Sequence, residues 1–243
     1  MGTGLHPGYR LVDLAAVDST NAEALRRIET GDGAGTVIRA DRQTRGRGRK
    51  GARWESPEGN LHMSLVVEPP DPSTVGQISF LAAVAAGQGV EDLAGPLPDL
   101  AYKWPNDLMI GGAKLGGILI EGGLGGVYVV GIGLNIVGAP EVPEHPTVAL
   151  RDLSAWEGGP GDLLVTICNR FAEWYDLWRS AGFGPVRETW LRRAAGIGSA
   201  VEARLLAETR RGVFRDIGMD GALILELADG TCREITAGAI YFA

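Results

Sequence analysis

Residues 101–134 read AYKWPNDLMIGGAKLGGILIEGGLGGVYVVGIGL, and the pattern of this stretch determines the class of fold. The dipeptide Gly111-Gly112 lies between two extended, mainly apolar segments, Asp107–Ile110 and Lys114–Glu121. Glycine pairs suit the two-residue turns of β-hairpins, because both central residues of such a turn adopt positive φ angles. We therefore predict a hairpin with its turn at this dipeptide.

The same pattern continues on both sides of this hairpin. Gly122–Gly126 is a second glycine-rich turn, and it leads into Val127–Leu134, a near-continuous apolar run typical of a buried central strand. On the N-terminal side, Ala101–Trp104 is another extended segment, separated from the hairpin by Pro105. Consecutive strands joined by short turns favour an antiparallel or mixed sheet over one built from alternating βαβ units.

Helices are expected before and after this group of strands. Thr20-Asn21-Ala22-Glu23 has the form of a capping box, which marks the start of a short helix that ends near Gly31. We expect further helices at Val75–Leu93, Asp162–Ala181 and Gly184–Ala194, and further strands at Thr36–Asp41 and Leu61–Val67. The predicted fold class is α+β, with a mixed or antiparallel sheet and flanking helices.

The composition changes near Gly196, after which short alternating runs follow one another. We expect strands at Val201–Leu206, Gly212–Ile217, Ala222–Leu227 and Thr231–Ile235, with hairpin turns at Asp220-Gly221 and Asp229-Gly230. The chain is therefore divided into a catalytic domain, residues 1–195, and a small C-terminal β-barrel, residues 196–243. So small a barrel is expected to depend on the larger domain for its stability.

Charge is distributed unevenly along the chain. Between Arg39 and Arg53, fifteen residues include seven basic ones, although the whole chain has a net charge of −7. Outside this window 16 basic residues are set against 29 acidic ones, a net charge of −13. The acidic body argues against general affinity for nucleic acid or anionic lipid. Glycines within the cationic window leave backbone N–H groups free to approach an anion.

The composition excludes several classes of protein. Hydrophobic residues make up 45% of the chain and charged residues 22%, which is typical of a globular domain. Two cysteines, Cys168 and Cys232, are too few for a disulfide framework, and three scattered histidines, His6, His62 and His145, make a His-built zinc site improbable. The sequence has neither a secretory signal nor a membrane-spanning run. We expect a soluble protein of the reducing cytoplasm.

Three segments offer chemistry: Gly46–Gly51 (GRGRKG), Lys103–Asp107 (KWPND) and Lys114–Leu119 (KLGGIL). None has the form of a phosphate-binding P-loop or of a Rossmann glycine fingerprint, and no serine or cysteine nucleophile motif is present. Cations, backbone donors and an Asn-Asp pair can stabilise phosphate charge and bind magnesium. Lys114 enters an apolar strand, which is costly unless an anion compensates its charge.

Taken together, these segments resemble the biotin protein ligases, also called biotin–[acetyl-CoA-carboxylase] ligases. The resemblance rests on five motifs in the family's order: Asp18-Ser19-Thr20-Asn21, Gln43 through Trp54 with the Gly-Arg-Gly-Arg loop, Lys103–Asp107, Lys114–Leu119 and Gly131–Asn135. It implies a two-step reaction, in which the carboxylate of biotin attacks the α-phosphate of MgATP to give biotinyl-5′-adenylate. A lysine of the biotin carboxyl carrier protein then attacks this mixed anhydride.

The resemblance also implies roles for individual residues. Catalysis is expected from Lys114, Arg49 and Arg47, which can supply positive charge over the reacting centre. Biotin binding is expected from Ser19, Thr20, Asn21, Gln43, Arg47, Gly48, Arg49, Lys114, Gly116 and Gly117. ATP binding is expected from Arg49, Trp54, Lys103, Asn106, Asp107, Lys114 and Asn135, with Asp107 as a Mg²⁺ ligand.

Other interpretations of these residues remain open at this point. Ser19 or Thr20 could cap a helix, Trp104 and Pro105 could be packing residues, and Lys103 could be an ion-pair partner. Asn106-Asp107 could be an ordinary turn. The adenine contacts, sought in residues 137–150, cannot be assigned from any motif, and the chain could be a monomer or a homodimer.

Two other functions would use part of the same sequence pattern. A lipoate–protein ligase would share the fold, but the sequence has no stretch that resembles that family's Arg…Gly-Gly-Gly-Ala…His signature. A nucleic-acid-binding protein would use the Arg/Gly loop, but it should have interleaved aromatic residues and a basic face. The 17 residues before Asp18 are too few for the winged helix with which some biotin ligases bind DNA, so we expect no DNA binding.

Overall fold

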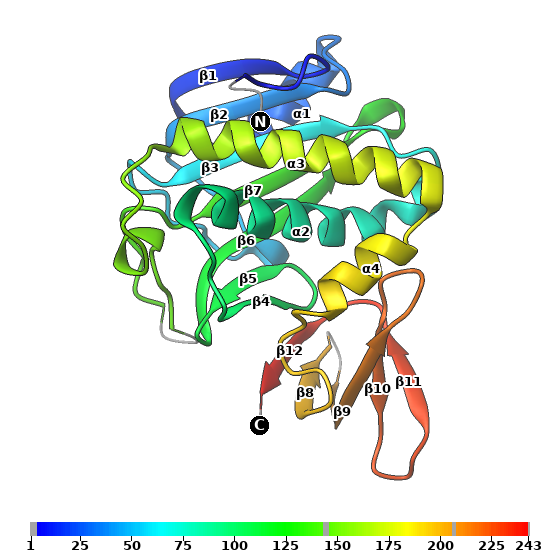
Figure 1. The fold of residues 1–243 in the computed structure, drawn as a ribbon. Helices are drawn as coiled ribbons and strands as arrows, with labels where there is room; N and C mark the ends of the chain where they lie inside the picture. Colours follow the sequence, from blue (N-terminus) through cyan, green and yellow to red (C-terminus); the bar gives the residue numbers. More distant parts are fainter. Residues whose placement is uncertain (1–3, 143–145, 206–207, 243) are drawn as a thin grey trace.

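The structure is a computed structural model that describes residues 4–142, 146–205 and 208–242. Its larger part is a seven-stranded mixed sheet with the strand order β1-β2-β3-β7-β6-β5-β4 (Figure 1). The strands are β1 (Arg10–Val17), β2 (Thr36–Gln43), β3 (Leu61–Val67), β4 (Leu100–Lys103), β5 (Asp107–Ile110), β6 (Ala113–Gly122) and β7 (Tyr128–Leu134). The predicted α+β class is confirmed.

The predicted hairpin is present between β5 and β6. Gly111 and Gly112 form its turn with φ angles of 57° and 81°, the combination that glycine adopts without strain. β6 then pairs antiparallel with β7 from Gly116↔Leu134 to Gly122↔Tyr128. All strand pairs of this sheet are antiparallel except β1 and β2, which run parallel and are connected through α1 (Thr20–Glu29).

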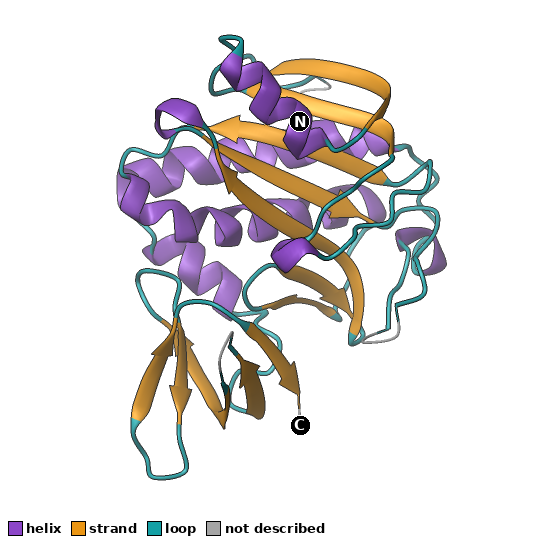
Figure 2. Cartoon of the chain, turned by 180° about the vertical axis from the view of Figure 1, so that it is seen from behind, coloured by secondary structure: helices purple, strands orange, loops and turns teal. Residues whose placement is uncertain are grey.

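Helices cover both faces of the sheet. α2 (Val75–Ala94) and α3 (Pro160–Ala181) lie over one face, with α4 (Gly184–Leu191) at the end of this layer (Figure 1). α1 lies on the opposite face, where Ala24 packs in a separate buried cluster with Ile38, Val66 and Val129. Seen from behind, this second face is open beside α1 and is bordered by loops (Figure 2).

The main core lies between the sheet and α2. Every residue of β3 is buried, so the strand has an apolar side toward α2 and a second side, with His62, Ser64 and Val66, toward α1. Aromatic rings close the core toward the C-terminal part: Phe80 lies 5.0 Å from Trp190 and 5.4 Å from Phe183 between ring centroids. The sheet face near α1 therefore carries the polar side chains.

The C-terminal part is a five-stranded antiparallel sheet in the order β11-β10-β9-β8-β12. Its strands are β8 (Ala200–Arg204), β9 (Thr209–Ile217), β10 (Leu223–Glu226), β11 (Cys232–Ile235) and β12 (Ala239–Phe242). The Trp104 indole N–H donates to the carbonyl of Gly221 at 3.1 Å, and Arg187 Nε donates to that of Ile217 at 2.6 Å. These contacts fix the small sheet against the large one.

Some expectations for the elements were wrong. No strand was expected at β1, a sheet edge without a buried residue, or at β12, which has only four residues. The capping box is absent: α1 begins at Thr20, the N-cap residue is Ser19, and its side chain makes no capping hydrogen bond. Leu206, the expected end of the strand that begins at Val201, lies outside the described residues, and so does His145.

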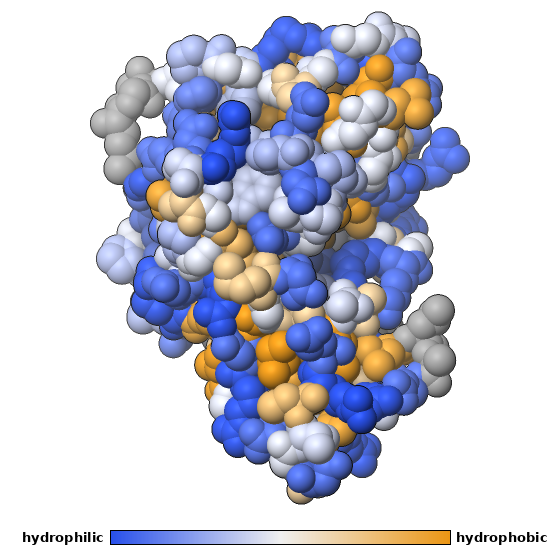
Figure 3. Space-filling view, turned by 90° about the vertical axis from the view of Figure 1, so that its right-hand side faces the viewer, coloured by the Kyte–Doolittle hydropathy of each residue, from blue (hydrophilic) through white to orange (hydrophobic). Residues whose placement is uncertain are grey.

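Hydrophilic residues cover most of the face shown in Figure 3, and hydrophobic residues lie between them in small groups. Such mixing is normal for the surface of a globular protein. Among the described helices, none combines the length and the apolar character needed to cross a membrane.

Candidate active site

A cavity of about 590 Å³ lies beside α1 on the sheet face opposite α2, and it extends to the C-terminal sheet. All residues with an expected role line it, with the exception of Gly116. A side chain at Gly116 would collide with Leu134 and with the carbonyl of Gly133, so this glycine serves the close approach of β6 and β7. The cavity thus brings together residues that are far apart in the sequence: Ser19 and Asn135 are separated by 116 positions.

Three glycines form part of the cavity floor, and each leaves room for side chains of the site. A Cβ atom at Gly131 would lie 2.3 Å from Asn21 Oδ1, and one at Gly133 would lie 2.6 Å from Trp54 Cε2. One at Gly117 would lie 3.4 Å from Lys114 Nζ. Substitution at the first two glycines would displace a site residue, because real Cβ atoms do not approach other atoms so closely.

A buried hydrogen-bond network forms the end of the cavity next to α1. Gln43 Oε1 accepts from the backbone N–H and the hydroxyl of Thr20, at 2.8 and 3.1 Å. Ser64 Oγ lies 2.8 Å from Thr20 Oγ1, and Gln43 Nε2 donates to Ser56 Oγ at 2.9 Å. Ser19, a residue that is 4% exposed, makes no side-chain hydrogen bond to the described residues. This end can therefore present a fixed polar surface to a ligand.

Asn21 and Arg47 meet at a residue for which the sequence analysis had assigned no role. Glu121 Oε2 accepts from Asn21 Nδ2 at 2.8 Å and from Arg47 Nη2 at 2.9 Å. Asn21 Nδ2 also donates to the carbonyl of Leu119, while Asn21 Oδ1 accepts from Ser64 Oγ at 2.5 Å. The side chain of Asn21 is thus engaged with the protein itself. The signal that could have indicated Glu121 is a carboxylate directly after the apolar run Ile118–Ile120.

The anion that compensates Lys114 is Asp107. Lys114 Nζ lies 2.7 Å from Asp107 Oδ1, and each side chain is 18% exposed. Lys114 Nζ also lies 5.7 Å from the centre of the Trp54 ring, within the range of a cation–π contact. β5 and β6 position the pair, since Asp107 begins one strand of the hairpin and Lys114 lies near the start of the other.

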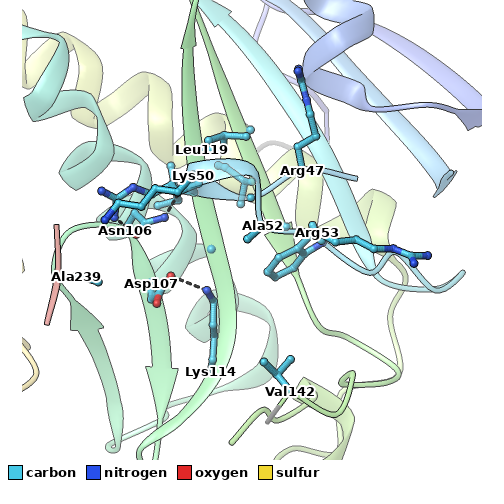
Figure 4. Close-up of a pocket in the computed structure, with 18 of the residues that line it drawn as sticks. Arg47, Lys50, Ala52, Arg53, Asn106, Asp107, Lys114, Leu119, Val142 and Ala239 are labelled. Atoms are coloured by element: carbon cyan, nitrogen blue, oxygen red, sulfur yellow. Dashed lines mark hydrogen bonds and ion pairs between the residues drawn. The ribbon is translucent and has the colours of Figure 1, made fainter. Parts of the chain in front are cut away.

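Arg49 is the residue of the cationic loop that enters the site. Its Nη1 donates to Asn106 Oδ1 at 3.2 Å, and Asn106 Nδ2 donates to the carbonyl of Ile118 at 2.6 Å. Burial lowers the pKa of the Arg49 guanidinium, and the charge of Asp107 partly offsets this effect. The group remains positively charged at neutral pH. By contrast, Arg47 and Arg53 extend away from the Lys114–Asp107 pair (Figure 4).

The C-terminal sheet completes the cavity with residues that the sequence analysis did not assign: Arg204, Leu205, Gly238, Ala239 and Tyr241. Lys103 Nζ lies 5.2 Å from the ring centre of Tyr241, whose ring also carries the Arg204 guanidinium at 3.9 Å. Burial lowers the pKa of Lys103, with Lys114 acting in the same direction. Lys103 makes no ion pair within the described residues, which contradicts the ion-pair interpretation.

Three side-chain atoms are buried without a hydrogen-bond partner in the described part of the chain, namely Trp54 Nε1, His62 Nδ1 and Asn135 Oδ1. All three residues line the cavity. Asn135 Nδ2 contacts the carbonyls of Lys114 and Val148, at 3.4 and 3.3 Å, and thereby holds the segment after β7 against β6. Unpaired donors and acceptors indicate a region prepared for a polar ligand.

The remaining interpretations are resolved by contacts. Trp104 is 2% exposed and packs against the C-terminal sheet, so it is a packing residue, while Pro105 lines the cavity. The described residues hold no cluster of three or more His, Cys, Asp or Glu side chains that could bind a metal ion. Asp107 is the carboxylate that pairs with Lys114 through Oδ1, and its Oδ2 has no partner among the described residues.

Comparison with known proteins supports the same reading of these motifs. Residues 15–136 match the biotin/lipoate A/B protein ligase family, and residues 196–243 match the biotin protein ligase C-terminal domain. The chain is 37% identical to a biotin–[acetyl-CoA-carboxylase] ligase of Paracoccus denitrificans, covering 94% of this chain and 99% of that protein. It is 32% identical to the enzyme of the same name from Mycobacterium tuberculosis, covering 98% and 91%.

The fold is shared with a solved structure as well. A biotin protein ligase from Aquifex aeolicus, in complex with biotin and ATP, superimposes with a TM-score of 0.83 at 25% identity and covers 96% of this chain and 98% of that one. The resemblance found in the sequence is confirmed. The chain belongs to the biotin/lipoate A/B protein ligase family, as a biotin protein ligase with the C-terminal domain of that group.

Proposed function

We propose that this chain activates biotin with ATP and transfers it to a lysine of the biotin carboxyl carrier protein of acetyl-CoA carboxylase or a related carboxylase. The observation that carries the proposal is one continuous cavity, which runs from the polar network at Thr20 and Gln43, past Lys114 and Asp107, to Trp54 and Asn135. Such a cavity can hold biotin and ATP with the two reacting groups beside the cations.

In the first half-reaction, a carboxylate attacks a phosphate, and both are negatively charged. Lys114 and Arg49 lower the barrier by placing positive charge over the carboxylate and the α-phosphate as pyrophosphate leaves. Lys114 and Asp107 are each only 18% exposed, and this partial burial strengthens the electrostatic effect of the cations. Ser19, Gln43 and the backbone near Gly117 are assigned to biotin.

The nucleotide is assigned to the other end of the cavity. Trp54, Asn135 and His62 have unpaired polar atoms there, and they surround a space next to the apolar floor at Ile132 and Gly133. Lys103, near Tyr241, is placed to contact the departing pyrophosphate. The C-terminal sheet thus takes part in nucleotide binding through the same cavity wall.

A magnesium ion fits this donor set when ATP supplies most of its ligands. Mg²⁺ is commonly bound by one or two carboxylates together with substrate phosphates. Asp107 offers one carboxylate, with Oδ2 available, and Asn106 lies next to it. The ion would add positive charge at the phosphates, and Asp107 would hold it while Lys114 faces the reacting carboxylate.

In the second half-reaction, the acceptor lysine attacks the carbonyl of biotinyl-5′-adenylate, an amide forms, and AMP leaves. The neutral amine is the nucleophile, so the acceptor loses a proton during this step. We assign the enzyme to the cytoplasm, because both of its cysteines are free and such a compartment keeps thiols reduced.

Intact-mass measurement of an acceptor domain tests this function. The protein is incubated with ATP, Mg²⁺ and the biotin carrier domain of a bacterial acetyl-CoA carboxylase, with either biotin or lipoate. Addition of one biotin, lost when the acceptor lysine is replaced by arginine, supports the proposal. Addition of lipoate without biotin would assign the chain to the lipoate ligases of the same fold.

A further inference from the structure

The outward side of the cationic loop is not explained by the chemistry of the cavity. Of the basic residues between Arg45 and Arg53, Arg49 points toward Asn106 and Arg47 is paired with Glu121. The three others, Arg45, Lys50 and Arg53, are exposed and form no ion pair with any described residue, although Lys50 and Arg53 also reach the rim of the cavity. We call these three the outer cations.

The outer cations share one groove. It has a volume of about 780 Å³ and lies between the loop and the start of α1, with Arg45, Lys50, Arg53 and Arg47 along its wall. Its two acidic lining residues are already engaged, since Asp18 pairs with Arg26 at 2.7 Å and Glu121 pairs with Arg47 at 2.9 Å. Three positive charges therefore remain without compensation on a protein whose net charge is −7.

The groove borders the active-site cavity directly. Residues on the rim line both hollows, among them Ser19, Gly48, Ala52 and Leu119. A protein that delivers a lysine to the cavity from this side must lie along the outer cations. Because the lysine and the outer cations repel each other, the surface around that lysine has to be acidic if it is to bind here.

We propose that this groove is the docking surface for the acceptor protein, and that it selects an acceptor whose lysine is flanked by carboxylates. This inference rests on the proposed function and specifies the partner of its second half-reaction. The outer cations act by steering and orienting the acceptor, an effect that raises the association rate and weakens with salt. Arg45 lines the groove and not the cavity, so it is the outer cation whose charge can be reversed without touching the site of adenylate formation.

Nucleic acid is the other polyanion that an arginine-rich groove could bind. The groove lining described here has no aromatic side chain on which a base could stack. Trp54, the aromatic residue of the segment, lies against Gly133 on the cavity side. The acidic body of the protein would also repel a long polyanion that extends beyond the loop. An acidic protein surface of limited size fits these features better.

The test separates the two half-reactions in one protein. Arg45→Glu reverses the outer cation that lines the groove but not the active-site cavity, and it leaves Arg47, Arg49 and Lys114 in place. The control, Arg179→Glu, makes the same change in net charge at an exposed position of α3. Biotin-dependent ATP–pyrophosphate exchange measures the first half-reaction, and transfer from preformed biotinyl-adenylate to the biotin carrier domain measures the second.

The docking variant should retain exchange within about twofold, while kcat/KM for the carrier domain falls about tenfold or more at low salt. The difference from wild type should shrink as NaCl is raised to about 0.5 M, and the control variant should behave as wild type in both assays. Transfer that is equally fast and equally salt-dependent in all three proteins would overturn the proposal. So would a short DNA or RNA duplex that binds wild type but not the docking variant while transfer stays unchanged. Absence of exchange in wild type would instead refute the proposed function itself.

Discussion

Lys114 Nζ lies 2.7 Å from Asp107 Oδ1, across the β5–β6 hairpin and beside the Trp54 ring. The lysine is therefore held by a carboxylate of the same hairpin and does not depend on a ligand for its charge compensation. Under the proposed function, a negatively charged ligand would compete with Asp107 for Lys114, and the carboxylate would then be free to hold a magnesium ion. The pair would in this way couple the binding of the ligand to that of the metal.

Replacing Lys114 by alanine is expected to lower adenylate formation about 100-fold or more, the scale of losing one transition-state donor. The apolar floor of the cavity stays intact, so the variant should remain folded. Pyrophosphate exchange and circular dichroism measure the two properties. Arg179→Ala, which removes an exposed cation elsewhere, serves as control and should change neither. Normal exchange by a folded Lys114→Ala protein would exclude the assigned role.

Replacing Asp107 by asparagine should weaken both the enzyme and its fold. The partner ammonium is left without its anion in a site that is 18% exposed, so we expect a loss of about 2 kcal/mol in the free energy of unfolding, less than for a fully buried pair. The Mg²⁺ concentration required for half-maximal exchange should rise as well. Urea titrations and a magnesium series measure these changes. An unchanged magnesium requirement would remove Asp107 from the metal site.

Replacing Arg49 by glycine tests how the cationic loop retains the intermediate. The substitution removes the contact with Asn106 and makes the loop more flexible, so closure over the ligand costs more entropy. Dissociation of radiolabelled biotinyl-adenylate should accelerate at least tenfold, and lysines of bystander proteins should become labelled. Hydrogen exchange of residues 43–53 should rise in parallel. Equal dissociation rates would mean that the loop does not retain the intermediate.

The two cysteines should differ sharply in reactivity. Cys168 is buried in α3, and burial raises the pKa of its thiol to about 12, whereas Cys232 is exposed on β11. Because the thiolate is the reactive form, a thiol reagent at pH 8 should modify Cys232 within minutes and Cys168 only after denaturation. Peptide mapping of the labelled protein distinguishes the two. Rapid labelling of Cys168 in the native protein would contradict the packing of α3.

The order of the central strands could be predicted because turn chemistry specifies it locally. Gly111 and Gly112 adopt the positive φ angles that their hairpin requires, and the buried run of β7 lies in the middle of the sheet. β1 could not be predicted, since an edge strand with no buried residue has no strong apolar period. β12 has only four residues and gains its place by pairing with β8.

The residues of the site also fall into those that local sequence indicates and those that depend on the fold. Residues of contiguous motifs, such as Lys114 and Asp107, could be assigned to one site from the sequence. Glu121 and Tyr241 could not, because their roles depend on contacts between elements that only the fold brings together: one with Asn21 and Arg47, the other with Lys103. The resemblance placed Arg47 at the reacting centre, whereas its guanidinium is paired with Glu121.

ATP–pyrophosphate exchange, measured in parallel with biotin and with lipoate, tests the central claim most directly. The exchange reports formation of an acyl-adenylate without any acceptor protein, so it depends only on the cavity described here. We predict exchange that requires biotin and Mg²⁺ and that lipoate does not stimulate. Lys114→Ala should lower the exchange rate to about 1% of the wild-type rate or less. Exchange driven by lipoate and not by biotin would contradict the account.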